Sequence, residues 1–270
     1  MAYTNNFRKE KKSFTKSSFT QRKPFRQPQK EFQKSYQKDM SFPMQNKPLS
    51  ESRLKGVFEE SRGRRLQFFT QNLVPGQTVY TEKIISFNGK ELRQWIPEKS
   101  KLCAGITNGL SQIGIKPGSK VLYIGAATGT TCSHVSDIIG IEGELYALDF
   151  APRTQRNLVF LTETRANMAC LLEDAKQPEN YKEKVGEVDV VFQDIAQRDQ
   201  AKIFIKNCTL CLKKGGFGLL AVKSRSIDVK KRPKDVFDEV KEELEKVFTI
   251  VDSRTLEPYE KDHYIFVIKK

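Results

Sequence analysis

Residues 121–137 have the sequence Val-Leu-Tyr-Ile-Gly-Ala-Ala-Thr-Gly-Thr-Thr-Cys-Ser-His-Val-Ser-Asp, which predicts a buried strand, a glycine turn and the start of a helix. The apolar run Val121–Ile124 is typical of a central parallel strand covered on both faces. Gly125 and Gly129 allow a sharp bend and let a ligand approach the backbone, because neither has a Cβ atom. The spacing lacks the Lys-Ser/Thr of a P-loop and the Gly-x-Gly-x-x-Gly of a dinucleotide site. It therefore predicts a nucleotide-cradling turn of another kind.

Acidic residues close the strands that we predict after this turn. Asp149 ends the strand 144–149, and a carboxylate there can accept both hydrogen bonds of a ribose diol. Asp174 and Asp194 end or follow the next two predicted strands. Since the carboxyl ends of parallel strands meet at one edge of an open α/β sheet, where ligands bind, these acids predict a binding site. For any one of them alone, a helix cap is the favoured alternative.

Three motifs carry a resemblance to a known family: Gly125-Ala-Ala-Thr-Gly-Thr-Thr-Cys-Ser-His-Val-Ser-Asp137, Asp194-Ile-Ala-Gln197 and Glu257-Pro-Tyr-Glu-Lys-Asp-His263. On these motifs, the chain from about Gly56 to its C-terminus resembles fibrillarin, the guide-RNA-directed ribose 2′-O-methyltransferase of box C/D ribonucleoproteins. Asn72-Leu-Val-Pro-Gly-Gln-Thr-Val-Tyr80 and Ser100-Lys-Leu102 add to the resemblance.

Smaller features refine this resemblance. Ala151-Pro-Arg153 and Ser224-Arg-Ser-Ile-Asp-Val229 look closer to archaeal members of the family. No glycine precedes Gly56, whereas many eukaryotic members carry Gly-Arg repeats in this region. Arg198 stands where relatives usually have proline. The resemblance implies the cytoplasm as the compartment for an archaeal chain and the nucleolus for a eukaryotic one, with a mild preference for the first.

The resemblance implies S-adenosyl-L-methionine as the methyl donor, and no metal. It places Thr130 and Thr131 at the methionine end, Asp149 and Phe150 at the ribose, and Asp174 and Ala175 near the adenine. The implied donor-binding residues are Gly125, Ala126, Gly129, Thr130, Thr131, Asp149, Phe150, Asp174, Ala175, Asp194 and Gln197. The family's catalytic Lys-Asp-Lys-His constellation corresponds to Lys101, Asp194, Lys223 and His263. The implied partners are a guide RNA with its target rRNA or tRNA, a Nop-domain scaffold protein and a kink-turn-binding protein.

Lys223 follows the predicted strand 216–222, so its amine should reach the ligand-binding edge. It acts as a base only if burial or a neighbouring cation such as Lys101 lowers its pKa, whereas an ion pair with Asp194 would raise that pKa. We therefore expect positioning of the ribose hydroxyl to contribute most to the rate enhancement. In favourable cases, positioning lowers the activation barrier by ~7–11 kcal/mol. His134 lies within the first crossover helix and is expected to be a packing or capping residue.

The order of elements predicts an α/β fold. The expected strands are 120–124, 144–149, 169–173, 188–193, 216–222, 247–255 and 262–268, and the expected helices are 130–139, 152–166, 198–212 and 232–246, with a helical turn at 178–182. The last two strands are separated by a short loop, which predicts an antiparallel edge pair. This fits a seven-stranded, Rossmann-like class I methyltransferase sheet better than a six-stranded dehydrogenase sheet.

We predict three parts: a disordered basic and aromatic tail (1–52), a small N-terminal β domain (53–98) and a methyltransferase domain (99–270). In the β domain, Asn88-Gly89 is a strong hairpin signal between the apolar runs on either side. In the next domain, residues 102, 106, 110 and 113 are apolar at helical spacing, and Lys116-Pro-Gly118 should end that helix.

The tail supplies most of the chain's basic character. Residues 1–50 contain 12 Lys and Arg against 3 Asp and Glu, a net charge of +9 out of +14 for the whole chain. Eight aromatic residues alternate with these cations, and aliphatic residues are almost absent, so the segment cannot bury enough apolar surface to order itself. Such a composition suits contact with RNA phosphates and stacking on bases, or a tail that only increases solubility. No signal-like or membrane-spanning apolar run is present.

The five cysteines form an odd number without a disulfide spacing, which indicates a reducing compartment. Cys208 and Cys211 share one predicted helical face with apolar residues, so we expect buried thiols rather than a zinc site. Two alternatives to RNA methylation keep this fold: methylation of a protein side chain, such as a histone glutamine, and a non-catalytic RNA-binding subunit. A nicotinamide dehydrogenase is disfavoured by the glycine spacing.

Overall fold

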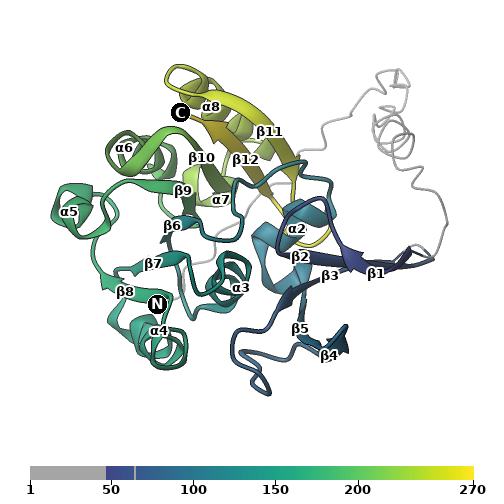
Figure 1. Cartoon of the computed structure of the whole chain (residues 1–270). Coiled ribbons are helices and arrows are strands. Elements are labelled where there is room, and N and C mark those ends of the chain that lie inside the picture. The colour runs from purple at the N-terminus through teal and green to yellow at the C-terminus, as the bar shows by residue number, and fades with distance from the viewer. Residues whose placement is uncertain (1–46, 64) are drawn as a thin grey trace, which may run out of the picture. The chain divides into compact units, whose positions relative to one another are not determined.

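The computed structural model describes residues 47–63 and 65–270, which form a seven-stranded and a five-stranded sheet (Figure 1). The predicted tail lies outside the described residues as far as residue 46. Within the described part, no helix is long and apolar enough to cross a bilayer.

The seven-stranded sheet confirms the predicted fold class. Its strand order is β11-β12-β10-β9-β6-β7-β8. Strands β10, β9, β6, β7 and β8 run parallel, and β12 pairs antiparallel with both β10 and β11, which is the predicted edge pair. The bounds are β6 (Lys120–Ile124), β7 (Glu144–Asp149), β8 (Met168–Leu172), β9 (Val188–Gln193), β10 (Leu212–Lys223), β11 (Thr249–Thr255) and β12 (His263–Lys269).

Helices cover both faces of this sheet. One face packs against α2 (Lys101–Thr107), α3 (Thr130–Ile139) and α4 (Pro152–Thr164). The other packs against α5 (Lys182–Val185), α6 (Gln200–Cys211) and α8 (Pro233–Glu245). Short helical turns lie at η1 (Pro97–Lys99), η2 (Pro178–Asn180) and α7 (Ser224–Ile227). Cys208 and Cys211 are fully buried on α6, which confirms them as core thiols.

The helix predicted from Leu102 to Ile113 ends early, so this prediction is wrong beyond Thr107. The chain turns at Gly109, which has φ +94°, and Leu110 folds back over α2. A Cβ atom on Gly105 would lie only 2.7 Å from Leu110 Cδ1, so Gly105 provides the space that Leu110 fills. All four apolar residues at helical spacing are buried as expected, but Leu110 and Ile113 are buried from a loop.

The five-stranded sheet has the order β1-β2-β3-β5-β4. Its strands are β1 (Lys47–Glu51), β2 (Val57–Arg62), β3 (Arg65–Gln71), β4 (Ile84–Phe87) and β5 (Lys90–Trp95). The β4–β5 hairpin has positive φ at Asn88 and Gly89, as predicted for this turn. Strand β1 corrects the tail assignment for residues 47–51, which pair with β2 instead of lying in the tail. It escaped sequence analysis because its few apolar residues follow a strongly polar segment.

A buried polar cluster joins the two sheets. Arg93 on β5 donates to Glu82 Oε1 at 2.7 Å and to Asp137 Oδ2 on α3 at 2.9 Å, and all three side chains are 0% exposed. Arg165 donates to the other Asp137 oxygen at 2.6 Å. Thr70 on β3 also donates to Asp137, at 2.9 Å. Two cations and two carboxylates therefore balance each other inside the protein, which is the condition for stable burial of charge.

His134 extends this cluster. Its Nδ1 lies 2.7 Å from Thr70 Oγ1, its Nε2 lies 2.6 Å from the Tyr80 hydroxyl, and its ring stacks on Trp95. Burial, followed by the charges of Arg93 and Arg165, lowers the pKa of His134 well below its ordinary value. The ring is therefore neutral and structural, as the sequence predicted.

We expect Asp137→Ala to lower the free energy of unfolding by about 3–5 kcal/mol, because it leaves Arg93 and Arg165 buried with one carboxylate between them. Denaturant unfolding measures this change. The control is Lys234→Ala, which breaks an exposed ion pair with Asp238 and should cost less than about 0.5 kcal/mol. A loss of under about 1 kcal/mol for Asp137→Ala would contradict this account of the cluster.

Candidate active site

The predicted glycine turn connects β6 to α3. Gly125 and Gly129 have φ of +84° and +90°. A Cβ atom on Gly125 would lie 2.1 Å from the carbonyl oxygen of Asp194, and one on Gly129 would lie 2.2 Å from Leu161 Cδ1. Any larger residue at either position would clash with its neighbour. The turn also includes Ala126, whose amide donates to Leu148 on β7 at 3.1 Å. Thr130 and Thr131 begin α3.

Asp149 ties this turn to the neighbouring strand. It is the last residue of β7, and its Oδ2 accepts the Ala127 amide at 2.9 Å while its Oδ1 accepts the Ala151 amide at 2.9 Å. These two bonds fix the carboxylate between the glycine turn and the start of α4. Phe150 follows with 65% of its surface exposed. An exposed aromatic ring beside an oriented carboxylate suits a nucleoside.

Asp174 and Gln197 lie on the loops after β8 and β9, at the same edge of the sheet. Asp174 is exposed and accepts the Lys176 amide at 2.9 Å, and the next residue, Ala175, is buried. Gln197 is partly buried, and its carbonyl accepts the side chain of Gln200 at 2.9 Å. The donor-binding residues implied by the resemblance are thus spread over the ends of four neighbouring strands.

Asp194 pairs with Lys101. The Lys101 amine lies 2.8 Å from each carboxylate oxygen, and both side chains are 21% exposed. Two hydrogen bonds of the preceding residue, Ser100, fix the start of α2, where Lys101 lies. Ser100 caps this helix by accepting the Cys103 amide at 3.3 Å, and its hydroxyl also accepts Thr131 at 3.1 Å. The first turns of α2 and α3 are therefore joined beside Asp194.

Lys223 and His263 lie opposite each other on adjacent strands. They are directly paired residues in the antiparallel register of β10 and β12. The Lys223 side chain is exposed, and it forms no ion pair with any residue of the described part of the chain. Its backbone amide donates to Gln200 Oε1 at 3.1 Å, which fixes the end of the strand.

The His263 ring has a defined tautomer. Its Nδ1 lies 2.7 Å from the carbonyl oxygen of Lys261, so Nδ1 carries a proton that it donates to this carbonyl. Burial, together with the charge of Lys101, lowers the pKa of His263 below its ordinary value. The ring is thus neutral near pH 7, with Nε2 as a free hydrogen-bond acceptor. The charges of Lys101 and Asp194 act on this pKa in opposite directions.

The structure therefore brings Lys101, Asp194 and His263 together, with Lys223 on the adjoining strand. Sequence analysis missed the positioning roles of Ser100 and Gln200. Ser100 precedes a helix with the spacing of a cap, so its signal was present. Gln200 had no comparable signal, because its contact with Lys223 joins separate elements.

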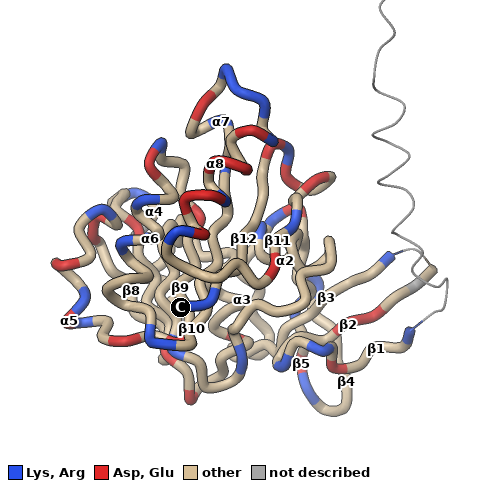
Figure 2. The backbone as a smooth tube through the Cα atoms, turned by 90° about the horizontal axis from the view of Figure 1, so that it is seen from above, with Lys and Arg blue, Asp and Glu red and all other residues tan. Residues whose placement is uncertain are grey.

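Basic residues follow the end of β10 at this edge of the sheet. Figure 2 shows Lys and Arg in the segment beside α7, where Lys230, Lys231 and Arg232 follow one another. Glu239 and Asp235 pair with Lys231 and Arg232, respectively. In the part of the chain that the structure describes, no group of His, Cys, Asp and Glu side chains is placed to hold a metal ion.

The fibrillarin family model matches residues 49–270. The chain belongs to the fibrillarin family. Among curated fibrillarins, the fibrillarin-like rRNA/tRNA 2′-O-methyltransferase of Thermococcus gammatolerans is 55% identical over 201 residues, which cover 74% of this chain and 89% of that protein.

Solved fibrillarin structures agree with this membership. Aeropyrum pernix fibrillarin, in complex with natively bound S-adenosyl-L-methionine, has a TM-score of 0.75 and 39% identity, covering 84% of this chain and 100% of that chain. A fibrillarin/Nop5p complex has a TM-score of 0.68 and 38% identity over 76% of this chain and 94% of that one. The resemblance predicted from the sequence motifs is thus confirmed.

We expect Gly125→Ala to destabilise this fibrillarin more than Gly118→Ala does. The two glycines have similar φ, +84° and +78°, but a Cβ on Gly118 would meet nothing within 4 Å. The control thus measures the conformational cost alone, about 1–2 kcal/mol. The clash with Asp194 should add about 1–3 kcal/mol. Denaturant unfolding measures both variants, and equal losses would show that the approach of Asp194 does not require a glycine.

Proposed function

We propose that this chain is the catalytic subunit of a box C/D ribonucleoprotein, and that it transfers a methyl group from S-adenosyl-L-methionine to the ribose 2′-hydroxyl of rRNA and tRNA. One observation carries the proposal. In a chain of the fibrillarin family, Lys101, Asp194, Lys223 and His263 gather beside a glycine turn at one edge of the sheet. The name of the Thermococcus relative gives the same reaction.

The described residues fit the donor. Gly125 and Gly129 leave space for a ligand at the backbone, and the Asp149 carboxylate faces the same turn as a partner for a ribose diol. Thr130 and Thr131 would hold the methionine end of the donor. Phe150, Asp174 and Ala175 would contact its nucleoside. Asp194 and Gln197 would complete the pocket. S-adenosyl-L-methionine supplies a methyl group that its sulfonium already activates, so the protein's task is to position the acceptor and remove its proton. The Aeropyrum fibrillarin, which has this donor bound, supports the assignment.

His263 is the better proton acceptor of the two candidates. Its Nε2 is free, and the ring is neutral near pH 7 because burial and Lys101 lower its pKa. A lysine side chain serves mainly as a hydrogen-bond donor. The exposed Lys223 then orients the hydroxyl or an adjacent phosphate. Lys101 balances the charge of Asp194 and fixes that carboxylate at the junction of donor and acceptor.

The proposed partners follow from the family. The fibrillarin/Nop5p complex supports a Nop-domain scaffold protein. We further propose a guide RNA that selects the target by base pairing, and a kink-turn-binding protein that organises the guide. The archaeal relatives favour the cytoplasm over the nucleolus as the site of action.

Reconstitution with a chosen guide, a Nop scaffold and a kink-turn-binding protein tests the function. Labelled methyl should enter the target ribose and make that position resistant to alkaline cleavage. Lys223→Ala should reduce single-turnover transfer by roughly 10²–10⁴-fold while donor binding persists, because positioning is lost. The control is Lys246→Ala, which removes an exposed lysine at the end of α8. Label in protein instead of RNA would favour the glutamine-methyltransferase alternative, and no donor binding would favour a non-catalytic subunit.

The pH dependence identifies the proton acceptor. If His263 accepts the proton, single-turnover transfer stays constant as pH falls from about 8 to 6.5 and declines only below that, because its pKa is lowered and the neutral form is active. His263→Gln should remove this decline and slow transfer by roughly 10²–10⁴-fold. If a lysine were the base, the rate would instead keep rising, by about tenfold per pH unit, as the pH increases above about 7. Calorimetry of donor binding at each pH controls for lost affinity.

A further inference from the structure

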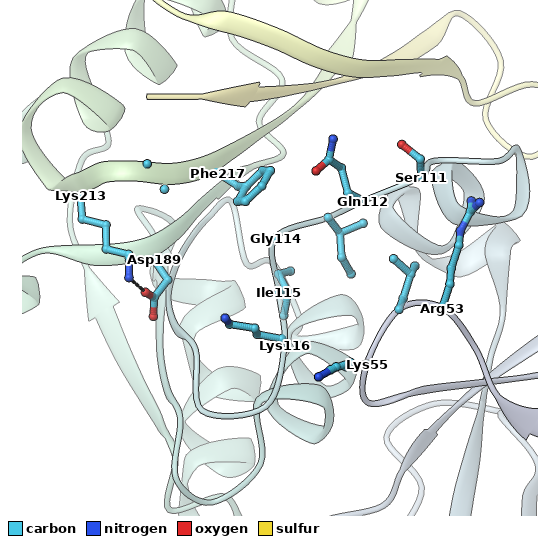
Figure 3. Close-up of a pocket in the computed structure, with 14 residues that line it drawn as sticks. Arg53, Lys55, Ser111, Gln112, Gly114, Ile115, Lys116, Asp189, Lys213 and Phe217 are labelled. Carbon is cyan, nitrogen blue, oxygen red and sulfur yellow. Dashed lines mark ion pairs between the residues drawn. The ribbon is translucent and has the colours of Figure 1, made fainter.

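A second concave site lies at the opposite edge of the seven-stranded sheet (Figure 3). Its volume is about 340 Å³. The β1–β2 turn, the loop before β6, the start of β9 and the start of β10 form its walls. The parallel strands β6 and β9 begin here and end at the glycine turn and Asp194. We call this site the amino-edge crevice.

The amino-edge crevice is basic. Four cations line it, from three separate elements: Arg53, Lys55, Lys116 and Lys213. The lining contains one acid, Asp189, which pairs with Lys213. Burial tends to raise the pKa of Asp189, but the Lys120 amide and Lys213 lower it overall, so the carboxylate stays charged. Arg53 donates to the Leu110 carbonyl at 2.7 Å.

Lys55 and Lys116 are the cations left for a ligand. Both are exposed, and neither forms an ion pair with another residue of the described ranges. Figure 3 shows Lys55 and Lys116 on two separate loops at the crevice. Asp189 lies close enough to Lys116 for the lysine charge to lower its pKa, but it pairs directly with Lys213. The four cations of the lining therefore outnumber its one carboxylate, which favours binding of an anion.

The walls between these cations are rigid. A Cβ atom on Gly114 would lie 2.4 Å from Phe217 Cβ, so this loop packs directly against β10. A Cβ on Gly216 would lie 2.9 Å from the Asp189 carbonyl oxygen, which packs β10 against β9 in the same way. The partly exposed Phe217 ring lines the crevice between the charged groups. The loop that carries Lys116 and the start of β10 are therefore packed closely against their neighbours.

We propose that the amino-edge crevice binds the phosphodiester backbone of single-stranded RNA, as a contact separate from the methyl-transfer site. This inference rests on the proposed function, because an RNA substrate is what brings a polyanion to the protein. Lys and Arg side chains contact phosphates without reading sequence, and an aromatic surface accommodates any base.

One further observation favours RNA over a small anion. Strand β10 carries Phe217 of the crevice and Lys223 of the active site in its regularly paired part, so the two sites lie roughly 20 Å apart along one strand. An extended polyanion can reach both sites, whereas a small anion cannot.

The test measures the affinity of the full chain for a short unstructured RNA over a range of salt concentrations. The double variant Lys55→Ala/Lys116→Ala should lower the slope of log affinity against log salt by about 1.4, since each lost single-strand phosphate contact contributes about 0.7. The matched control, Lys90→Ala/Lys246→Ala, removes two exposed lysines, one from the β4–β5 hairpin and one from the end of α8, and neither forms an ion pair among the described residues. Its slope should stay near that of the unchanged chain.

Methylation by the reconstituted particle separates this inference from the proposed function. The crevice variant should need more RNA for half-saturation, with an unchanged single-turnover rate at saturation and unchanged donor affinity. Equal slopes for the crevice and control variants overturn the crevice assignment, even if the particle methylates normally. Loss of scaffold binding with an unchanged RNA slope also overturns it and assigns the crevice to an acidic protein surface. If the salt slope changes only in the crevice variant and the reconstituted particle transfers no methyl group, the crevice assignment is supported and the proposed function is wrong.

Discussion

The buried ion pair between Arg93 and Asp137 holds the two sheets of this protein together. Both side chains are completely buried, so the pair is stable only because Glu82 and Arg165 balance its charges. The consequence reaches the active site through α3. This helix carries Asp137 in its last turn, and its first residues follow the glycine turn. The N-terminal sheet is therefore a support for the donor-binding turn, and its position and the geometry of that turn depend on each other.

The close approach of Gly125 to Asp194 sets the second constraint. Because β6 and β9 are neighbouring parallel strands, their ends meet, and the missing Cβ lets the two backbones touch. Asp194 then lies within reach of Lys101 from α2, and that pairing leaves the Lys223 amine free on the next strand. The two lysines thus differ in environment: Lys101 neutralises the carboxylate, while Lys223 is exposed and forms no ion pair among the described residues.

Much of this fold could be predicted from the sequence because its signals are local. The bounds of β6 and α3 agree residue for residue with the prediction, since an apolar run, a glycine turn and an amphipathic helix follow each other directly. The end of α2 could not be predicted, because Leu110 keeps the helical spacing and only its packing on Gly105 turns the chain. The site residues were found through motifs, but not their pairing. Lys101 and Asp194 are 93 positions apart, and either lysine was a suitable partner for the carboxylate.

The strand order sorts charge along the active edge. From β10 to β8, the strand ends present Lys223, then Asp194 with its partner Lys101, then the glycine turn, then Asp149 and Asp174. A donor that carries a positive sulfonium is attracted toward the acidic half, whereas a polyanionic acceptor is attracted toward β10 and repelled by the acids. For an RNA bound at Lys223, as proposed above, a path across β7 and β8 is therefore unfavourable. The proposed path leaves the edge on the side of β10, whose other end lies at the amino-edge crevice. The same strand order that separates donor from acceptor thus also gives the acceptor its direction.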